Sequence, residues 1–227
     1  MVTALLLAGA CSPLHSHKDD YLGDTFVFVT LARHEFELEY WIDGRSEPRG
    51  GMHTVGFEYG ITDRFMADAS LRWAQNSGGP FRFETGFLEL RRRFGEEGAH
   101  FIDIAASLEY EVDNGEPGEE HRLLEPRLVL SRDFHGWNAT LNLFYAAVLD
   151  DSRRSAFEAA AGLRAPSWGR WNAGVEFQRQ LALENKTLLI PQLWYRVGKE
   201  GFLKAGVGRN FAGDRDSFVR FAVEFEF

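Results

Sequence analysis

Pairs of carboxylates two residues apart recur along the sequence. Three such pairs are Glu37 and Glu39, Glu109 and Glu111, and Glu224 and Glu226. Because side chains at positions i and i+2 of a strand point to the same face, each pair could hold two carboxyl groups side by side, as glycoside hydrolysis requires. The spacing recurs on many segments, however, and a repeated pattern indicates a charged face of a sheet better than one catalytic site.

Nucleophilic catalysis is the second chemistry to consider, because a serine needs a histidine base within reach. The histidines beyond the N-terminal stretch are His34, His53, His100, His121 and His135. All five lie at expected strand ends or in connectors, and no serine lies within two residues of a histidine in a strand. We therefore expect a protein that is not an enzyme, and keep a lipid-hydrolysing or acyl-transfer enzyme as an alternative.

Metal and cofactor chemistry has little support. His15 and His17 lie beside Asp19 and Asp20, and such a group could hold a metal loosely. Within the polar stretch Ser12 to Asp24 it fits a solvated N-terminus better. No phosphate-binding loop or dinucleotide fingerprint occurs, so we expect no cofactor and no metal.

Composition restricts the class of partner. The formal net charge is -9 and the Lys and Arg residues are scattered, which argues against a nucleic-acid partner. Mean hydropathy is -0.28, and no run of about 18 apolar residues exists to form a membrane helix. A membrane-spanning barrel remains compatible, because only alternate residues of each strand face lipid. The aromatic share of 14% would supply its interfacial girdles.

The charged residues alternate with apolar ones, most clearly at the end of the chain. Apolar side chains occupy the odd positions Val219, Phe221, Val223, Phe225 and Phe227, and the even positions between them are small or charged. This period of two predicts a strand with one apolar and one polar face.

The same alternation runs through the chain from Phe36. It predicts twelve strands of about 9 to 13 residues. An even number of strands returns the C-terminus to the side of the membrane on which the first strand begins. We therefore expect an all-β fold, a single closed, antiparallel, up-and-down transmembrane β-barrel. Polar connectors alternate with short ones, and we expect the short set at the end that holds both termini.

Three positions interrupt the pattern. Pro126 and Pro191 lie inside expected strands, where each removes a ladder donor and should mark a bulge or a weakened pairing. The phase of Phe81 to Phe94 shifts near Phe87 and Leu88, which predicts a bulge there.

These features resemble bacterial outer-membrane β-barrels over Phe36 to Phe227. The alternation, the roughly 10-residue length and the final Phe227 are similar to the closing strand of such barrels. The turn from Tyr59 to Phe65 resembles the short turns of small transporter-type barrels of proteobacteria. The resemblance implies an outer-membrane location in a Gram-negative bacterium, contact with membrane lipid, and recognition of the C-terminal strand by the barrel-assembly machinery. It resolves neither the exact family nor the oligomeric state.

The start of the chain reads as an export signal. The apolar run from Thr3 ends in Ala8-x-Ala10, like a secretory signal peptide cut before Cys11. A lipoprotein signal with Cys11 lipidated is the alternative, although Ala8 stands where such signals usually have Leu. We therefore divide the chain into a signal-peptide remnant (1–10), a polar N-terminal segment (11–35) and the barrel (36–227). Thr25 to Ala32 is β-rich without clean alternation, and should extend the first strand or lie in the barrel mouth.

If the apolar phase faces lipid, the other phase lines the lumen. The predicted lining residues are Glu37, Glu39, Glu58, Asp68, Arg72, Arg91, Asp103, Glu109, Glu125, Arg127, Glu158, Arg164, Glu176, Arg196, Arg220 and Glu224. In a soluble sandwich the same face would simply meet solvent. In a barrel its acidic excess would favour cations in a water-filled lumen.

Three functions remain open. The first is a channel for passive passage of small polar or charged solutes. The second is a closed structural barrel that scaffolds a partner, with ion pairs filling the lumen. The third is the outer-membrane enzyme.

Overall fold

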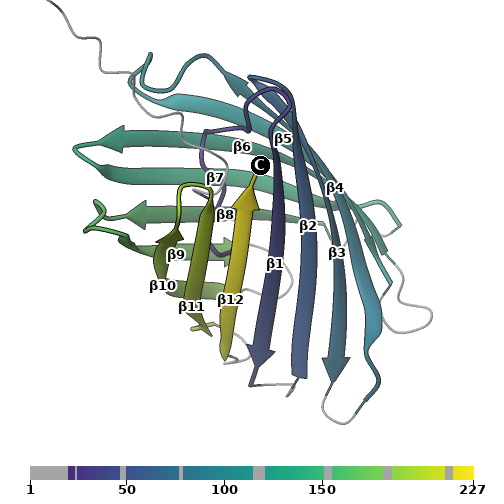
Figure 1. The fold of residues 1–227 in the computed structure, drawn as a ribbon. Helices are drawn as coiled ribbons and strands as arrows, with labels where there is room; N and C mark the ends of the chain where they lie inside the picture. Colours follow the sequence, from purple (N-terminus) through teal and green to yellow (C-terminus); the bar gives the residue numbers. More distant parts are fainter. Residues whose placement is uncertain are drawn as a thin grey trace, which may run out of the picture.

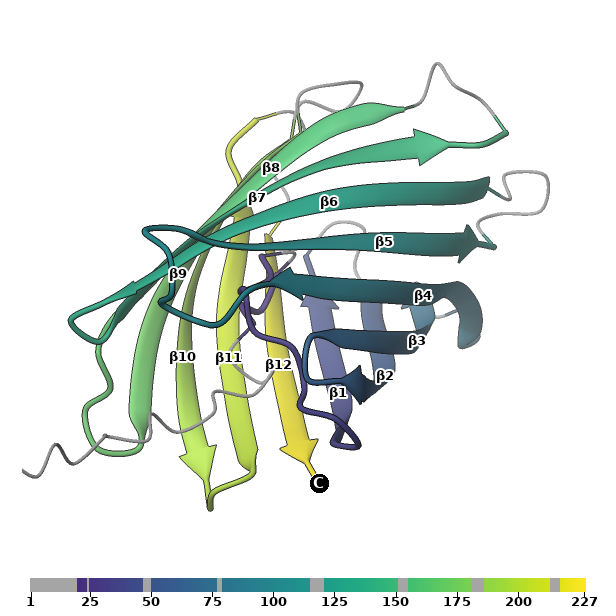
Figure 2. The ribbon, with the colours of Figure 1, turned by 90° about the horizontal axis from the view of Figure 1, so that it is seen from above.

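Antiparallel strands close into one barrel (Figure 1). The computed structural model describes residues 20–23, 25–46, 50–76, 79–114, 121–150, 155–180, 186–212 and 217–227. Within these ranges twelve strands pair in the order β1-β12-β11-β10-β9-β8-β7-β6-β5-β4-β3-β2, which closes on itself. The predicted all-β, twelve-stranded antiparallel barrel is confirmed, and Figure 2 shows it from above.

The strands are 9 to 14 residues long, close to the predicted 9 to 13. They are β1 (Phe36–Arg45), β2 (Gly50–Thr62), β3 (Phe65–Asn76), β4 (Arg82–Phe94), β5 (Asp103–Asp113), β6 (His121–Phe134), β7 (Trp137–Val148), β8 (Ala156–Arg164), β9 (Trp171–Gln180), β10 (Thr187–Val197), β11 (Gly201–Asn210) and β12 (Ser217–Glu226). Among the described residues, no helix has the length and apolar composition needed to cross a bilayer.

The seam between β1 and β12 closes the barrel. Its register runs from Glu37↔Glu226 to Arg45↔Phe218. Beyond it, the backbone N–H of Phe227 donates to the carbonyl oxygen of Phe36 at 2.8 Å, and the two rings stack with centroids 5.0 Å apart. The terminal phenylalanine thus extends the seam by one residue, and a closed seam leaves no unpaired edge.

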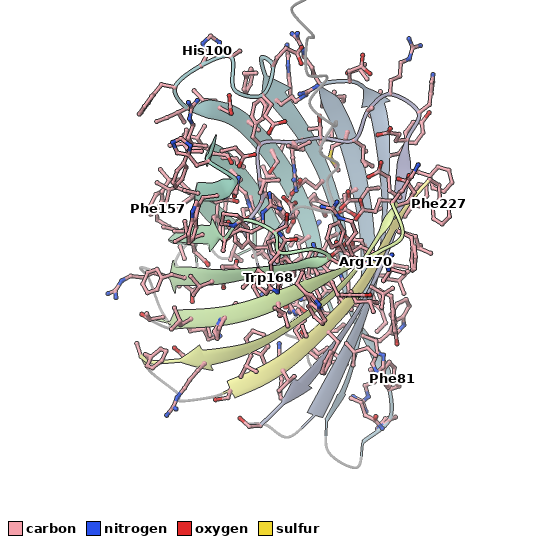
Figure 3. The ribbon with its side chains drawn as sticks, turned by 60° about the vertical axis from the view of Figure 1, so that its left-hand side comes forward. Phe81, His100, Phe157, Trp168, Arg170 and Phe227 are labelled. Atoms are coloured by element: carbon pink, nitrogen blue, oxygen red, sulfur yellow. The ribbon has the colours of Figure 1, made fainter. Side chains whose placement is uncertain are left out.

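The two faces of the sheet differ sharply in polarity. On β1, Leu38, Tyr40 and Ile42 are exposed on the outside, whereas Glu37 and Glu39 are buried on the inside. Figure 3 shows Phe81, Phe157 and Phe227 on the outside of the barrel. The charged face is buried, which excludes the soluble sandwich, and the apolar outer face suits hydrocarbon rather than water.

The two strand prolines weaken pairing without shifting it. The pairs on the two sides of Pro126 and Pro191 are Leu124↔Ala147 and Arg127↔Phe144, and Leu189↔Arg209 and Gln192↔Gly206. In each case the register is the same before and after the proline. The pairs between them are missing, which confirms the predicted weakened pairing. Both proline rings are exposed on the outer face.

The bulge predicted at Phe87 and Leu88 lies elsewhere. The register between β3 and β4 shifts at Arg72 and Trp73, which leaves Glu84 as the extra residue. Phe87 instead faces the lumen, with the Arg72 guanidinium 4.7 Å from its ring centroid. An inward aromatic beside an outward leucine resembles a change of phase, which is why the sequence pattern misplaced the bulge.

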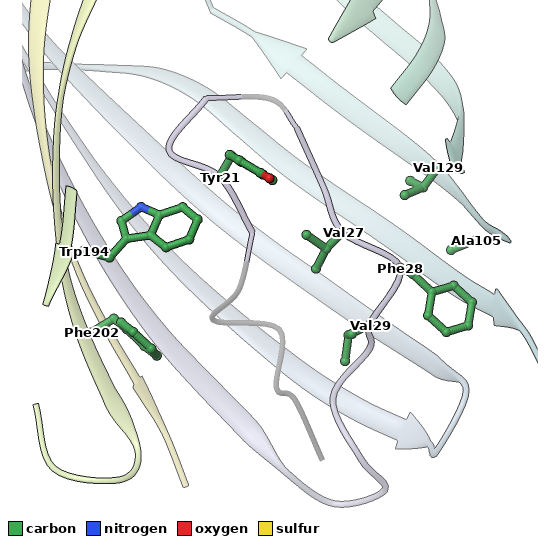
Figure 4. Packing of buried hydrophobic residues seen from close by; sticks show 8 residues of the cluster. All are labelled: Tyr21, Val27, Phe28, Val29, Ala105, Val129, Trp194 and Phe202. Carbon is green, nitrogen blue, oxygen red and sulfur yellow. The ribbon is translucent and has the colours of Figure 1, made fainter. Parts of the chain in front are cut away.

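Residues 20–23 and 25–32, which precede β1, lie inside the barrel (Figure 4). Tyr21, Leu22, Val27, Phe28 and Leu31 are at most 2% exposed. We call residues 20–23 and 25–32 the lumen segment.

The position of this segment corrects two expectations. The predicted solvated N-terminus is wrong for residues 20–23, which are buried. Thr25 to Ala32 does not extend β1; its last residues line a cavity at the barrel mouth, as predicted, and the rest lies deeper inside. The segment's own apolar residues account for the difference, because packing against apolar side chains of the inner wall removes them from water. The predicted cleavage site, Cys11, His15 and His17 lie outside the described residues.

Candidate functional site in the barrel lumen

The lumen segment packs on apolar patches of the inner wall. The Tyr21 ring meets the Trp194 ring edge-on, with centroids 5.5 Å apart. One buried cluster joins segment and wall, and its members are Tyr21, Val27, Phe28, Val29, Ala105, Val129, Trp194 and Phe202. The wall contribution comes from β5 and β6 on one side and from β10 and β11 on the other, so the segment spans the lumen.

Wall side chains bind the backbone of the segment. The N–H of Leu22 donates to Gln192 Oε1 at 2.9 Å, and the N–H of Gly23 donates to Glu176 Oε2 at 2.7 Å. Glu176 Oε1 also accepts the hydroxyl of Thr25 at 2.6 Å. These contacts satisfy polar groups that burial would otherwise penalise.

Two asparagines of β7 continue this recognition. Asn142 Oδ1 accepts the N–H of Phe26 at 2.8 Å, and Asn142 Nδ2 donates to the carbonyl oxygen of Phe26 at 2.9 Å. The Tyr21 hydroxyl donates to Asn138 Oδ1 at 3.0 Å. The side-chain amide of Asn142 therefore pairs with both backbone groups of one residue.

Three cations hold the end of the segment nearest Asp20. Arg91 Nη1 donates to Asp20 Oδ2 at 2.8 Å, and Lys204 Nζ donates to the Asp20 carbonyl oxygen at 2.7 Å. Arg220 Nη1 donates to the Leu22 carbonyl oxygen at 2.6 Å. Each cation also pairs with a wall carboxylate, those of Glu89, Glu224 and Asp43 respectively. Buried charges require such compensation.

Two wall glycines make room for the segment. A Cβ on Gly162 would lie 2.5 Å from Tyr21 Cζ, and a Cβ on Gly60 would lie 1.9 Å from the carbonyl oxygen of Ala32. Real Cβ atoms do not approach so closely, so the wall is shaped to the segment at both ends.

A tight turn joins the segment to β1. His34 has φ 72°, and its N–H donates to the Gly60 carbonyl oxygen at 2.8 Å. The Arg33 N–H donates to Asp63 Oδ1 at 3.1 Å, and His34 Nδ1 lies 2.9 Å from the Tyr59 hydroxyl. The turn sits at the end of the barrel that holds Phe227, so the segment enters from that end.

Beyond the segment lies a cavity of about 310 Å³. Its acidic lining residues are Asp20, Glu39, Glu58, Asp68, Glu109, Glu111, Glu125, Glu158 and Glu224, and its basic ones are Arg72, Arg91 and Arg127. Nine carboxylates against three guanidinium groups leave a formal excess of six negative charges. Trp41, Phe26, Phe87 and Phe144 supply aromatic surface. We call this space the acidic cavity.

A second cavity, of about 650 Å³, opens at the end of the barrel that holds Phe36 and Phe227. Val29, Thr30 and Ala32 of the lumen segment line it, whereas Asp20, Tyr21, Gly23 and Phe26 line the acidic cavity. At its rim the Arg64 guanidinium donates to Glu96, and that hydrogen bond, with the charge of Arg93, holds the pKa of the Glu96 carboxyl below its usual value. The segment therefore has a cavity on each side.

The structure brings most predicted lining residues together. Ten line the acidic cavity: Glu39, Glu58, Asp68, Arg72, Arg91, Glu109, Glu125, Arg127, Glu158 and Glu224. Asp103 and Arg164 line a cavity of about 10 Å³ against residues 27–29, and Glu176 and Arg220 bind the segment directly. Arg196, in contrast, is exposed near the end of β10.

Glu37 is fully buried on the inner face. Its carboxylate and those of Glu39 and Glu224 have oxygen atoms within 4.8 Å of one another. A divalent cation accepts carboxylates at such spacing. The Lys204 ammonium already lies 2.6 Å from Glu224, however, and supplies positive charge to this group.

Sequence reasoning missed the lumen segment and its amide partners Asn138, Asn142 and Gln192. Two signals pointed to them. The apolar run Thr25 to Ala32 precedes the first amphipathic strand without alternating, and glycines such as Gly162 occupy the inner phase. Both features fit a segment held against the wall.

Similarity to known proteins is confined to the fold. No protein-family model matches the sequence, and no curated protein matches it. Among solved structures, the KdgM porin in complex with disordered oligogalacturonate superposes with TM-score 0.67 at 12% identity, over 84% of this chain and 99% of that one. The NanC porin gives 0.66 at 10% identity, over 83% and 98%. Outer membrane phospholipase A from Escherichia coli gives 0.59 at 12% identity, over 83% and 92%.

The chain thus has the fold of the bacterial outer-membrane β-barrels, as the sequence pattern predicted. Porins and a phospholipase share this fold, so the fold alone does not separate transport from catalysis.

Two histidines on the outside contact tyrosine hydroxyls: His34 meets Tyr59, and His53 Nδ1 lies 2.6 Å from the hydroxyl of Tyr40.

Proposed function

We propose that this protein is an outer-membrane channel for passive passage of small polar or charged solutes, with a preference for cations. The observation that carries the proposal is the acidic cavity inside a closed barrel. A lumen lined by one sign of charge and walled by low-dielectric material concentrates counter-ions of the opposite sign.

The lining also suggests which solutes suit the lumen. The KdgM porin has been solved with oligogalacturonate, a polyanion, which the excess negative charge of the acidic cavity would repel. A compact organic cation fits better, because carboxylates would balance its charge while Trp41 and Phe87 offer aromatic faces to it. The cavity volume favours a small molecule.

Reversal potentials in a planar bilayer test this proposal. Under a tenfold KCl gradient the refolded protein should prefer potassium over chloride. Glu111→Gln with Glu158→Gln removes two lining charges and should reduce that preference. Glu200→Gln removes one charge from an exposed turn and should leave it unchanged. An anion preference, or a cation preference that the double variant leaves intact, would contradict the proposal.

A closed structural barrel is the second candidate, favoured by the lumen segment that fills the barrel interior. A folded barrel that passes no current under any condition would support it.

The fold likeness to outer membrane phospholipase A motivates one further assay, release of fatty acid from phospholipid vesicles. Release that is lost in His53→Ala would favour an enzyme instead.

A further inference from the structure

We propose that the barrel wall carries a binding site for a short peptide, that its resident occupant is the chain's own lumen segment, and that departure of this segment opens the channel. The opening step rests on the proposed channel function, whereas the peptide site does not. The lumen segment is then a plug.

The first support is that side chains of the wall form hydrogen bonds with the peptide backbone. Glu176, Gln192 and Asn142 bind backbone groups of Leu22, Gly23 and Phe26 at 2.7 to 2.9 Å. Such contacts hold the main chain, because every residue except proline offers the same donor and acceptor. The space at Gly162 adds selectivity for the side chain of Tyr21.

The second support is the shape of the wall. Gly162 leaves the space that the Tyr21 ring fills, and Gly60 leaves the space for the Ala32 backbone. A lumen that served only as a water-filled pore would have no need of matched hollows at both ends of this segment.

The third support is that the barrel closes without the segment. Strand pairs close the sheet all the way round, and none of the described residues from 20 to 35 belongs to a strand. The contacts described above between segment and wall are hydrogen bonds of side chains and the ion pair of Asp20 with Arg91, which water can replace. The turn at His34 keeps the segment attached at the rim while its remainder moves.

A swap of side-chain size tests departure. Gly162→Leu puts bulk where Tyr21 lies, and should raise the fraction of time the channel is open. Adding Tyr21→Ala removes the clash and should return the variant towards the wild-type current. The matched control is Gly44→Leu, because a Cβ at Gly44 meets nothing within 4 Å.

Thiol labelling follows the segment independently of current. Cys11 is the single cysteine, so Cys11→Ser with Val27→Cys leaves one thiol, at a position 2% exposed. Gly162→Leu should speed its reaction with a membrane-impermeant maleimide about tenfold or more, the usual scale for overpacking a well-fitted site. Gly44→Leu should leave the rate unchanged.

The two readouts separate the two proposals. Faster labelling with more current supports both. Faster labelling in a barrel that never conducts shows that the segment leaves, and overturns the channel function alone. Unchanged labelling in a Gly162→Leu barrel that is folded, as judged by heat-modifiable migration, overturns the plug.

A peptide added in trans tests the binding site itself. The Asp20→Asn variant loses the ion pair with Arg91 and should conduct more than wild type. A synthetic peptide with the sequence of residues 20–32 should then block its current, and a scrambled peptide should not. Absence of block at millimolar peptide, the effective concentration of a tethered segment, would overturn the peptide site.

Discussion

Arg91 joins the lumen segment to the barrel wall through one guanidinium group. It is 1% exposed, pairs with both Asp20 and Glu89, and lies 3.7 Å from the Phe26 ring centroid. One guanidinium thereby compensates two buried carboxylates and covers an aromatic face. Arginine suits this position because its planar fork serves two acceptors at once.

Arg91→Ala should destabilise the folded barrel by about 3–5 kcal/mol, because it leaves the Asp20 and Glu89 carboxylates buried without their donor. Urea unfolding of the refolded protein measures the change. Arg64→Ala is the control, since Arg64 pairs with Glu96 at an exposed rim and exposed pairs add little. Equal effects from the two substitutions would contradict this account of Arg91.

Glu96 carries a pH-dependent contribution at the same rim. Its pKa is lowered by the hydrogen bond from Arg64 and by the charges of Arg93 and Arg64. A carboxyl group whose pKa is lower in the folded protein stabilises the fold at pH values above its pKa in the unfolded chain. This stabilisation is lost as the pH falls through the pKa of the folded protein. The small stability difference between wild type and Glu96→Gln should therefore be present at neutral pH and vanish below about pH 4. A difference that grew on acidification would contradict it.

At the scale of the strand, period two accounts for what the sequence could predict. Alternation is local, so the strands, their faces and ten of the cavity residues follow from it. The lumen segment has no period, and its partners are distant in the chain: Asn142 is 116 residues from Phe26, and Lys204 is 184 from Asp20. Such pairs leave no local signal. The bulge at Glu84 was missed because Phe87 is an inward aromatic, which alternation counts as outward.

The strand prolines lead to a prediction at this scale. Pro191→Val restores a backbone donor between two pairs of unchanged register, so it should stabilise the barrel by about 0.5–1.5 kcal/mol, the net value of one hydrogen bond. Urea unfolding tests it. Leu193→Val changes another outward side chain of β10 without adding a donor and is the control. A loss of stability in Pro191→Val would show that the proline relieves strain.

For the whole molecule, the distribution of charge matters more than any one residue. The chain carries a net charge of -9, and the acidic cavity alone holds a formal excess of six negative charges. If that field selects cations, screening must weaken the selection, since the Debye length falls from about 10 Å at 0.1 M salt to about 3 Å at 1 M.

The reversal potential under a fixed tenfold gradient should therefore move towards zero when both solutions are made more concentrated. The gradient is kept constant, so only the ionic strength changes. A preference that stayed the same would indicate selection by close contact within the acidic cavity rather than by its long-range field.

Pairing of β1 with β12 closes the barrel around the lumen segment, which precedes β1 in the chain. Residues 20–32 are synthesised before any strand, yet Lys204 on β11 and Arg220 on β12 belong to the last two strands. The segment meets its full set of partners only when the final hairpin arrives, which is also the event that joins β12 to β1. We therefore expect the lumen to become occupied at the stage of assembly at which the barrel closes.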